Sequence, residues 1–594
     1  SIGKPTVSIS FRAFGVNITM TRDANEVVEL SLKRAGLKLL KKLNGGGKKK
    51  KKKASKEGGA TGAENPVSIS LSLPGAPYKT HPHMEVWGAS TCLVIRIENT
   101  EDIAESKLLK LNVSINAPRF LCFESHEFPI VGFPLLAHLE LEFADIEADC
   151  RFTWASRGNV TGKDVEVWHG RVYVPTPADA GKLLVCKCVI RGQDDGATAE
   201  CMFGPVAAGP PSTDGRSSGS VRFPPGSADR LPGHHRVMTY NILLQSLVAD
   251  THPSDPICGQ GDYRKQLVVD EMLKSNANII SLQECAASLF QSYLEPVMRH
   301  AAGFRGIYRP KGLGSSEGCA IFFKTEEFDL IFDTAVSISD TLFQHQAPGW
   351  GRAKELYGVA MQKYTLPHIC QIAVVEARSR GGTGQNRIVV CNTHLFYHND
   401  AAFVRNIQCA VALEAAKEIM DTHGATTMVF SGDLNSTPET GVVEFLHKGW
   451  LPANHMEFSQ EALALFRGVQ KKLRGTSVGP SAPKRGNYPV QWVTKSGYKS
   501  IPEEAEGNLL FQHPFRFIPC FDALEPPLTL FSSVFVGTLD WLFFHGVERV
   551  RTLPLLPEAS LAEHGPFPSS VFPSDHVSVV ADFRVQGLSE ESAS

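Results

Sequence analysis

The sequence predicts an α/β fold for the second half of the chain, preceded by a β-rich region. From residue 236 onward, apolar strand-like runs alternate with segments whose apolar residues recur at helical spacing. Between residues 66 and 205, short runs with alternating apolar and polar residues follow one another. A stretch rich in Pro, Gly and Ser separates the two regions. At one domain per ~150 residues, the 594 residues correspond to about two to four domains.

The composition is that of a globular protein without a dominant charge. Hydrophobic residues make up 42%, and the formal net charge is −2, so any nucleic-acid binding must come from local patches. No apolar run reaches the ~20 residues that a membrane-spanning helix needs. The 13 cysteines include no C-x-x-C pair, which argues against a structural zinc site and a disulfide framework. We therefore expect a reducing compartment.

Four parts are expected along the chain. Residues 1–65 combine α and β signals with six consecutive lysines at 48–53, which favour a disordered loop over a nucleic-acid-attracting tail. Residues 66–205 are predicted to form a β-sandwich-like accessory domain, and residues 206–233 a linker. Residues 234–588 are predicted to form the α/β domain, with a basic surface excursion at about residues 454–508.

Polar residues stand where the apolar strands of the α/β domain end, which is where such folds build their sites. A single buried acid is commonly a satisfied core residue, but it is costly unless it is paired or bound to a metal. A whole set of acids and histidines at successive strand ends is better explained as a functional site. The candidates are Asn241, Glu284, Asn392, His394, Asp433, Asn435, Asp540, Asp575 and His576.

The types of these side chains predict both a metal and a chemistry. Carboxylate and amide oxygens without cysteine suit Mg²⁺, for which Mn²⁺ can substitute. Such an ion neutralises phosphate charge, an acid activates water, and a protonated histidine stabilises the developing negative charge. Two G-x-S-x-G matches, Gly314–Gly318 and Gly475–Gly479, lack the strand-then-helix context of a serine hydrolase. No Walker loop is present. We therefore expect phosphoryl chemistry.

The α/β domain carries, in this order, the motifs TYNIL, LQE, EGCAIFF, NTHL, GDLNSTP, LDWLFF and SDHVSVVADF. Together they resemble the endonuclease/exonuclease/phosphatase superfamily, most closely its poly(A)-deadenylase branch. The resemblance covers about residues 236–585. The β-rich region, the D-Y-R sequence at 262–264, and NTHLFYH followed by Arg405 and Gln408 are most similar to the mitochondrial 2′,5′-phosphodiesterases of that branch.

The resemblance implies a two-layered β-sandwich flanked by helices. It also implies a Mg²⁺-dependent phosphodiesterase or 3′-exoribonuclease that hydrolyses 2′,5′-oligoadenylate and poly(A) tails and releases 5′-AMP. The partner would then be oligoadenylate or poly(A) RNA, without a membrane, in the mitochondrial matrix or alternatively the cytoplasm. Two other functions stay open: another phosphoester hydrolase of the superfamily, or a non-catalytic RNA-binding scaffold. The retained Glu284, Asp433 and His576 disfavour the scaffold.

Matched position by position, the resemblance implies how metal and water would be held. Glu284 would be the principal Mg²⁺ ligand, with Asn241 beside it. Asp575 would join the metal shell or fix its neighbouring imidazole. Asp433 would orient and deprotonate the attacking water.

The same matching implies which side chains would hold the substrate. Asn435 would hold the scissile phosphate, and His394 and His576 would stabilise its oxygens. Asp540 would position His394.

Five further positions concern the substrate. Asn392 and Arg405 would contact it, and Phe535 would stack on the terminal base unless it is a core residue. Trp541 stands where the family usually has Tyr, and Cys285 where it usually has Val. These departures leave the chemistry intact and bear on substrate preference.

Overall fold

A computed structural model describes residues 119–585 except 127, 143, 159–161, 192–196, 212–214, 225–228, 232, 252–255, 313, 379–385, 469–483 and 486–508. Before residue 119 it describes only the strands given below. The predicted lysine-rich loop lies outside the described residues. The chain forms two compact units, one of residues 1–124, 138–152 and 187–201, and one of residues 125–137, 153–186 and 202–594. No helix in the described ranges is long and apolar enough to cross a membrane.

The first part of the chain forms small antiparallel sheets. Their strand orders are β2-β1-β6, β3-β4-β5 and β7-β9. The strands are β1 (Thr6–Ala13), β2 (Val16–Asp23), β3 (Ser68–Ser72), β4 (Cys92–Glu98), β5 (Lys107–Lys110), β6 (Asn112–Ile115), β7 (Arg119–Glu124) and β9 (His138–Glu142). The β-rich N-terminal region that the alternating pattern predicts is therefore confirmed.

A four-stranded sheet with the order β11-β10-β13-β14 follows. Its strands are β10 (Cys150–Arg157), β11 (Asp164–His169), β13 (Leu183–Ile190) and β14 (Thr198–Phe203). The buried Trp154 packs on Tyr173 and Phe203, with ring centroids 5.6 and 5.1 Å away. Its indole N–H donates to the carbonyl of Gly170 at 3.0 Å, so this aromatic centre buries no unpaired donor. That this region acts as an accessory domain stays a prediction.

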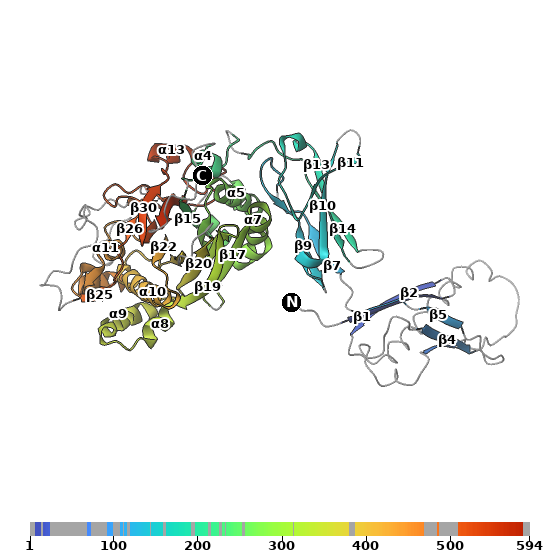
Figure 1. The fold of residues 1–594 in the computed structure, drawn as a ribbon, viewed down its shortest axis with the longest axis horizontal. Coiled ribbons are helices and arrows are strands. Elements are labelled where there is room, and N and C mark those ends of the chain that lie inside the picture. The colour runs from blue at the N-terminus through green and yellow to red at the C-terminus, as the bar shows by residue number, and fades with distance from the viewer. Residues whose placement is uncertain are drawn as a thin grey trace. The chain divides into compact units, whose positions relative to one another are not determined.

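Two six-stranded sheets form the α/β domain (Figure 1). Their orders are β17-β18-β16-β15-β31-β30 and β19-β20-β21-β22-β29-β26. In each sheet the central pair is parallel, β15 with β16 and β21 with β22, and the strands beside it are antiparallel. The strands of the first sheet are β15 (His235–Asn241), β16 (Ile279–Ala286), β17 (Phe304–Pro310), β18 (Glu317–Lys324), β30 (Val547–Thr552) and β31 (Val579–Val585). Those of the second are β19 (Phe328–Ser337), β20 (Ile369–Ala377), β21 (Arg387–His394), β22 (Thr427–Asp433), β26 (Ile518–Pro519) and β29 (Asp540–His545).

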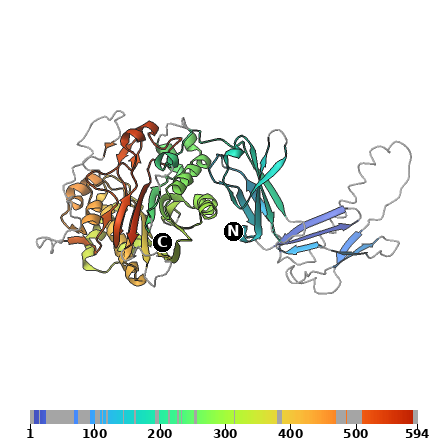
Figure 2. The ribbon, with the colours of Figure 1, turned by 45° about the horizontal axis from the view of Figure 1, so that its top comes forward.

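Alternate residues of each strand pack on opposite sides of its sheet. In β21, Ile388 and Val390 belong to the core shared by the two sheets, whereas Val389 and Cys391 belong to the core under the helices. Helices cover both outer faces (Figure 2). They are α5 (Gly261–Lys274) and α7 (Glu295–Ala302) on the first sheet, and α8 (Ile338–Gln344), α9 (Gly351–Met361), α10 (Ala402–His423) and α11 (Gly441–Lys448) on the second. The expected two-layered β-sandwich flanked by helices is confirmed.

The segment predicted as a linker contains a buried helix, α4 (Ser218–Arg222). The hydroxyl of Ser217 donates to Asp270 at 2.5 Å, and that of Ser218 donates to Glu271 at 2.7 Å. Arg222 donates to the carbonyl of Ser578 at 2.8 Å. The serines of this segment, which are typical of linkers, therefore pack against α5.

The first part of the segment predicted as a surface excursion is buried instead of lying on the surface. Phe458, Leu463 and Phe466 lie in the core under the helices, around α12 (Gln460–Phe466). Most of the remainder lies outside the described residues. After it come β25 (Leu509–Gln512), which pairs with β23 (Trp450–Pro452), and the hairpin β27 (Leu530–Phe531) and β28 (Phe535–Gly537).

Candidate active site

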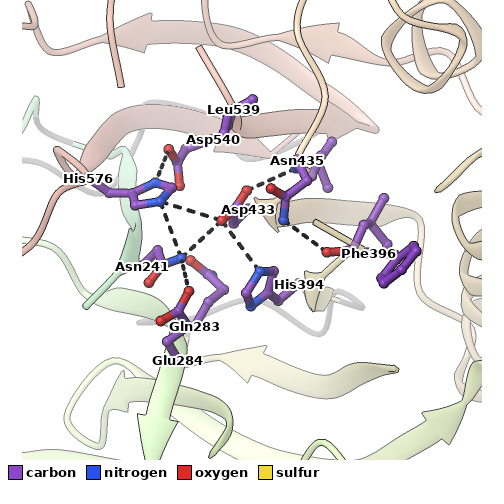
Figure 3. Close-up of polar contacts among 12 residues, drawn as sticks. Asn241, Gln283, Glu284, His394, Phe396, Asp433, Asn435, Leu539, Asp540 and His576 are labelled. Carbon is purple, nitrogen blue, oxygen red and sulfur yellow. Dashed lines mark hydrogen bonds and ion pairs between the residues drawn. The ribbon is translucent and has the colours of Figure 1, made fainter. Parts of the chain in front are cut away.

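The carboxyl ends of the two parallel strand pairs meet across the sandwich. Asn241 ends β15 and lies opposite Gln283, one residue before Glu284 in β16. In the second sheet, His394 at the end of β21 lies opposite Asp433 at the end of β22. The two sheets are joined here by the amide of Asn241, which donates to Glu284 Oε1 at 3.0 Å and to Asp433 Oδ2 at 2.9 Å (Figure 3).

Asp433 is a buried acid at the centre of this arrangement. Burial raises its pKa to about 7, although the charge of His576 and hydrogen bonds from Asn241 and Asn435 oppose the rise. The backbone N–H of Asn435 donates to Asp433 Oδ1 at 2.9 Å and fixes the carboxylate plane. A carboxyl group with a pKa near neutral pH suits proton transfer with water.

Asp540 positions His576 and not His394, which corrects the sequence prediction. Asp540 Oδ2 accepts from His576 Nδ1 at 2.8 Å (Figure 3). The strand register explains this partner. Asp540 lies opposite Asp433 in the β22–β29 pair, and the backbone of His576 forms an isolated antiparallel β-bridge with Leu530 of β27. Burial alone would lower the pKa of His576, but the carboxylates of Asp540 and Asp433 outweigh it and raise that pKa well above its usual value.

The pKa of His394 is shifted in the opposite direction. Burial and the positive charges of Lys311, His368 and His576 hold its pKa well below the usual value. Its Nε2 lies 3.6 Å from Asp433 Oδ2. Its Nδ1 is buried and has no hydrogen-bond partner among the described residues. The site therefore places two imidazoles whose pKa values are shifted in opposite directions on two sides of one carboxyl group.

Glu284 lies on the side of the site formed by the first sheet. Its backbone has φ 54°, a left-handed conformation that is uncommon for a non-glycine residue and directs its side chain out of the strand pattern. Its Oε2 accepts from the backbone N–H of Leu244 at 2.9 Å. Burial and the nearby carboxylates of Asp575 and Glu317 raise its pKa. Burial also raises the pKa of Asp575.

Asn435 lies beside the centre, in the turn after β22. It too has a positive φ, 47°, and its side-chain amide donates to the carbonyl of Leu395 at 2.9 Å. This bond ties the turn after β22 to the turn after β21. A role at the scissile phosphate, which the resemblance implies, stays a prediction.

Asn392 and Arg405 are not brought to the surface of the site. Asn392 is buried between the sheets, where it accepts from Gln283 at 2.7 Å and donates to the carbonyl of Leu282 at 3.0 Å. Arg405 is also buried and donates to the carbonyls of Phe396 and His398 at 3.1 and 2.7 Å. In this structure, both residues support the strand end and loop that carry His394.

Phe535 begins β28 and is half-buried. Its ring folds back over its own strand: a Cβ on Gly537 would lie 2.6 Å from Phe535 Cε1. Gly537 is thus required for this ring position. Phe535 does not belong to the described hydrophobic cores, which leaves the stacking role open as a prediction.

Three side chains near His394 were missed by sequence reasoning. Lys311, between β17 and β18, donates to Glu317 Oε1 at 2.9 Å. Ligand atoms of Glu317, Glu284 and His394 lie within 4.8 Å of one another. His368 is buried and adds to the electrostatic effect on His394. The available signal was the position of Glu317, the first residue of an apolar strand in EGCAIFF.

The donor set fits a hard cation. Two groups of ligand atoms, Glu284 with Glu317 and His394, and Asp433 with Asp540 and His576, each lie within 4.8 Å. None of these ligands is a cysteine, and carboxylate oxygens are the ligands that Mg²⁺ prefers. Asn241 points its amide nitrogen between the two acids, so a ligand role for its oxygen requires the amide to turn.

Sequence comparison gives relatives over most of the chain. No protein-family model matches. The 2′,5′-phosphodiesterase 12 of Homo sapiens is 26% identical over 528 residues, which are 83% of this chain and 78% of the relative. That of Rattus norvegicus is 26% identical over 98% of this chain and 92% of the relative. The CCR4-Not complex 3′-5′-exoribonuclease subunit Ccr4 of Mycosarcoma maydis is 23% identical over 60% of this chain and 52% of the relative.

Comparison with solved structures finds chains that match about 60% of this chain. ANGEL2, a 2′,3′-cyclic phosphatase, in complex with adenosine-2′,3′-vanadate, is 21% identical, with a TM-score of 0.44, over 60% of this chain and 98% of that chain. The human Nocturnin catalytic domain with bound sulfate is 20% identical, with a TM-score of 0.36, over 60% of this chain and 96% of that chain. The fold assignment rests on the strand order itself. The sequence relatives confirm that this chain resembles the endonuclease/exonuclease/phosphatase superfamily, in its deadenylase branch, with 2′,5′-phosphodiesterase 12 among its relatives.

Proposed function

We propose that this protein is a Mg²⁺-dependent phosphodiesterase and 3′-exoribonuclease that hydrolyses 2′,5′-oligoadenylate and poly(A) and releases 5′-AMP. The observation that carries the proposal is the buried acid Asp433 between two imidazoles, with the Nε2 atoms of His394 and His576 each 3.6 Å from its Oδ2. The names of the relatives, a 2′,5′-phosphodiesterase and a 3′-5′-exoribonuclease, support the substrate class. We extend the proposal to the mitochondrial matrix from the resemblance alone.

Glu284 is the residue best placed to hold the cation, with Asp433 opposite it and Asn241 between them. Burial favours binding of a positive charge here, because the two carboxyl groups otherwise lose hydration without compensation. A bound divalent cation would neutralise phosphate charge and lower the pKa of a bound water. Mn²⁺ uses the same oxygen ligands and would substitute.

Asp433 acts as the base in the proposed reaction. Its carboxylate takes a proton from water, and the water oxygen forms a bond to phosphorus. The bond from phosphorus to the 2′ or 3′ oxygen of the preceding nucleotide breaks, that oxygen takes up a proton from solvent water, and the terminal nucleotide leaves as 5′-AMP. The raised pKa of Asp433 makes its carboxylate a stronger base than that of a solvent-exposed aspartate.

The two histidines have different tasks in this proposal. His576 carries a proton and aims its Nε2 at the centre, because Asp540 holds its Nδ1. It therefore stabilises the negative charge that develops on the phosphate oxygens. The neutral His394 donates a hydrogen bond to a phosphate oxygen without placing a second positive charge beside His576.

The deciding experiment is digestion of 2′,5′- and 3′,5′-linked triadenylate side by side, with Mg²⁺, with Mn²⁺ and with EDTA. We expect 5′-AMP from at least one linkage, loss of product with EDTA, and its return when Mg²⁺ is restored. A dinucleotide phosphate and abasic DNA serve as comparison substrates. If either comparison substrate is cleaved and neither triadenylate gives product, the proposal is contradicted and another phosphoester hydrolase is favoured.

A further inference from the structure

A cavity of about 250 Å³ adjoins Glu284 on the first sheet. Three segments form its walls: residues 242–245 after β15, residues 261–268 at the start of α5, and residues 286–293 after β16. Glu284 itself forms part of the lining, at the side of the site labelled in Figure 3. The cavity is therefore continuous with the candidate active site.

The floor and the rim of this cavity differ in chemistry. Leu243 and Leu244 are buried and form an apolar floor. Ser288 and Ser292 are exposed and form a polar rim. An apolar floor with polar groups at the edge suits a flat aromatic ligand that stacks below and hydrogen-bonds at its border.

The floor is fixed to Glu284 by the backbone. Leu244 donates its N–H to Glu284 Oε2 at 2.9 Å, so the carboxylate and the cavity wall hold each other in place. A ligand that fills the cavity consequently contacts the group that we propose to hold the cation. A phosphodiester at that cation has a nucleoside on each side, and the cavity beside Glu284 offers space to one of them.

One wall presents an acceptor and a donor together. Lys265 Nζ donates to Asp262 Oδ1 at 2.8 Å and lies over the ring of Tyr293, 4.5 Å from its centroid. The hydrogen-bonding edge of adenine carries a donor, the N6 amino group, beside an acceptor nitrogen. The carboxylate and the ammonium match this pair.

We propose that this cavity binds the adenosine that adjoins the scissile phosphate on the Glu284 side, with Asp262 and Lys265 reading its base. The inference rests on the proposed function, whose substrate class it uses. The volume is below the roughly 300–1,000 Å³ of pockets for whole drug-sized ligands, and is suited to one nucleoside of a longer chain.

The test fills the cavity from its rim. Ser292→Trp places an indole in the cavity, and Gln291→Trp, at an exposed neighbour outside the lining, is the matched control. We expect Ser292→Trp to lower kcat/KM for triadenylate at least about tenfold, and at least about threefold more than it lowers kcat/KM for bis(p-nitrophenyl) phosphate, which has no adenine to fill the cavity. Gln291→Trp should leave both values within about twofold.

A second variant tests base reading. Asp262→Ala removes a half-exposed carboxylate without opening the core. We expect the ratio of kcat/KM for triadenylate to that for triuridylate to fall at least about threefold.

Binding of triadenylate, measured by calorimetry on the same proteins, separates the two proposals. Unchanged binding and unchanged kcat/KM in Ser292→Trp would overturn the cavity assignment alone. A different result would overturn the proposed function alone. In it, the wild type binds triadenylate, Ser292→Trp weakens that binding, and the wild type cleaves only the small diester. Absence of both binding and cleavage of triadenylate by the wild type would overturn both.

Discussion

The charge states of two histidines follow from their neighbours. His576 has Asp540 at 2.8 Å and Asp433 at 3.6 Å, and these carboxylates outweigh the burial that would otherwise lower its pKa. His394 faces the same Asp433 but is also close to Lys311 and His368, which add to burial in lowering its pKa. The difference between the two pKa values is thus set by Asp540 beside His576 and by Lys311 and His368 beside His394.

Asp540→Asn tests the role of the His576 charge. The substitution keeps an acceptor for Nδ1 but removes the negative charge, so the pKa of His576 falls. Because the protonated form is the active one, activity is lost at lower pH than in the wild type. We expect the basic limb of the kcat/KM profile to move down by about 1–3 pH units. A basic limb at the wild-type position would contradict the assignment.

Removal of a central acid tests the chemistry directly. Glu284→Ala and Asp433→Ala each remove an electrostatic element of the transition state, and loss of one such element costs about 10²–10³-fold in kcat. Because each acid also serves the metal or the water, we expect a loss of at least ~10³-fold in kcat for triadenylate. The exposed Asp421→Ala is the control and should keep wild-type kcat. More than a tenth of wild-type turnover in either active-site variant would contradict the roles.

Phe535→Ala distinguishes a stacking platform from a packing residue. Stacking on an aromatic is worth about 1–3 kcal/mol per base, so loss of the ring should lower kcat/KM by roughly 5- to 150-fold for every base. Truncation of a core Phe would instead cost about 3–5 kcal/mol of stability. The half-buried ring favours the first outcome. Unchanged kcat/KM with a large fall in melting temperature would remove Phe535 from the site.

The sequence predicts which residues gather but not all of their pairings. Asn241, Glu284, His394 and Asp433 end parallel strands, and strand ends meet by topology. The partner of Asp540 depends on the β22–β29 register and on the path of the chain before His576, which no local pattern encodes.

Each parallel pair of strands supplies one half of the site at the element scale. In both sheets the chain passes from one central strand through a helix on the outer face to its parallel neighbour: α5 between β15 and β16, and α10 between β21 and β22. Such crossovers place both carboxyl ends at the same edge of a sheet. The alternation of apolar strands and helical segments was sufficient to predict this arrangement. The loop before β18, which brings Lys311 to the site, carries no comparable signal.

A buried ion pair joins β15 to β31 within the first sheet. Arg236 donates to Asp582 at 2.5 and 3.0 Å, and both side chains are fully buried. Arg236→Met would leave the carboxylate with only Arg551, so we expect a loss of about 3–5 kcal/mol in the free energy of unfolding. The control Arg551→Met removes a partner that is 41% exposed and should cost about 1 kcal/mol or less. Equal losses in urea unfolding would contradict this ranking.

At the scale of the whole molecule, the segment before β15 is part of the α/β domain. Helix α4 gives the buried Asp270 and Glu271 their serine partners, and Phe223, which follows it, lies in the core under α5. A Cβ at Gly219 would lie 2.9 Å from the carbonyl oxygen of Asp270, so glycine permits the close approach. Ser and Gly are common both in linkers and in tight helix contacts, and composition alone does not separate the two. The partners lie far away in the sequence.

Two truncations test what the N-terminal part contributes. A chain that starts at residue 119 retains α4 and every acid and imidazole of the site. We expect it to cleave triadenylate with kcat/KM within about threefold of the wild type, because no chemistry is assigned to residues 1–118.

A chain that starts at residue 230 also retains the site but leaves the buried Asp270 and Glu271 without their α4 partners. Asp270 keeps Lys274 and Glu271 keeps Ser578, but each carboxylate loses one hydrogen bond, at about 1.5–3 kcal/mol per bond, and the core under α5 loses Phe223. The chain should therefore unfold at clearly lower urea concentration while its folded fraction still cleaves. Loss of metal-dependent cleavage in a well-folded chain from residue 119 would show that the β-rich region takes part in the chemistry. Equal unfolding midpoints for the two truncations would show that α4 does not stabilise the domain.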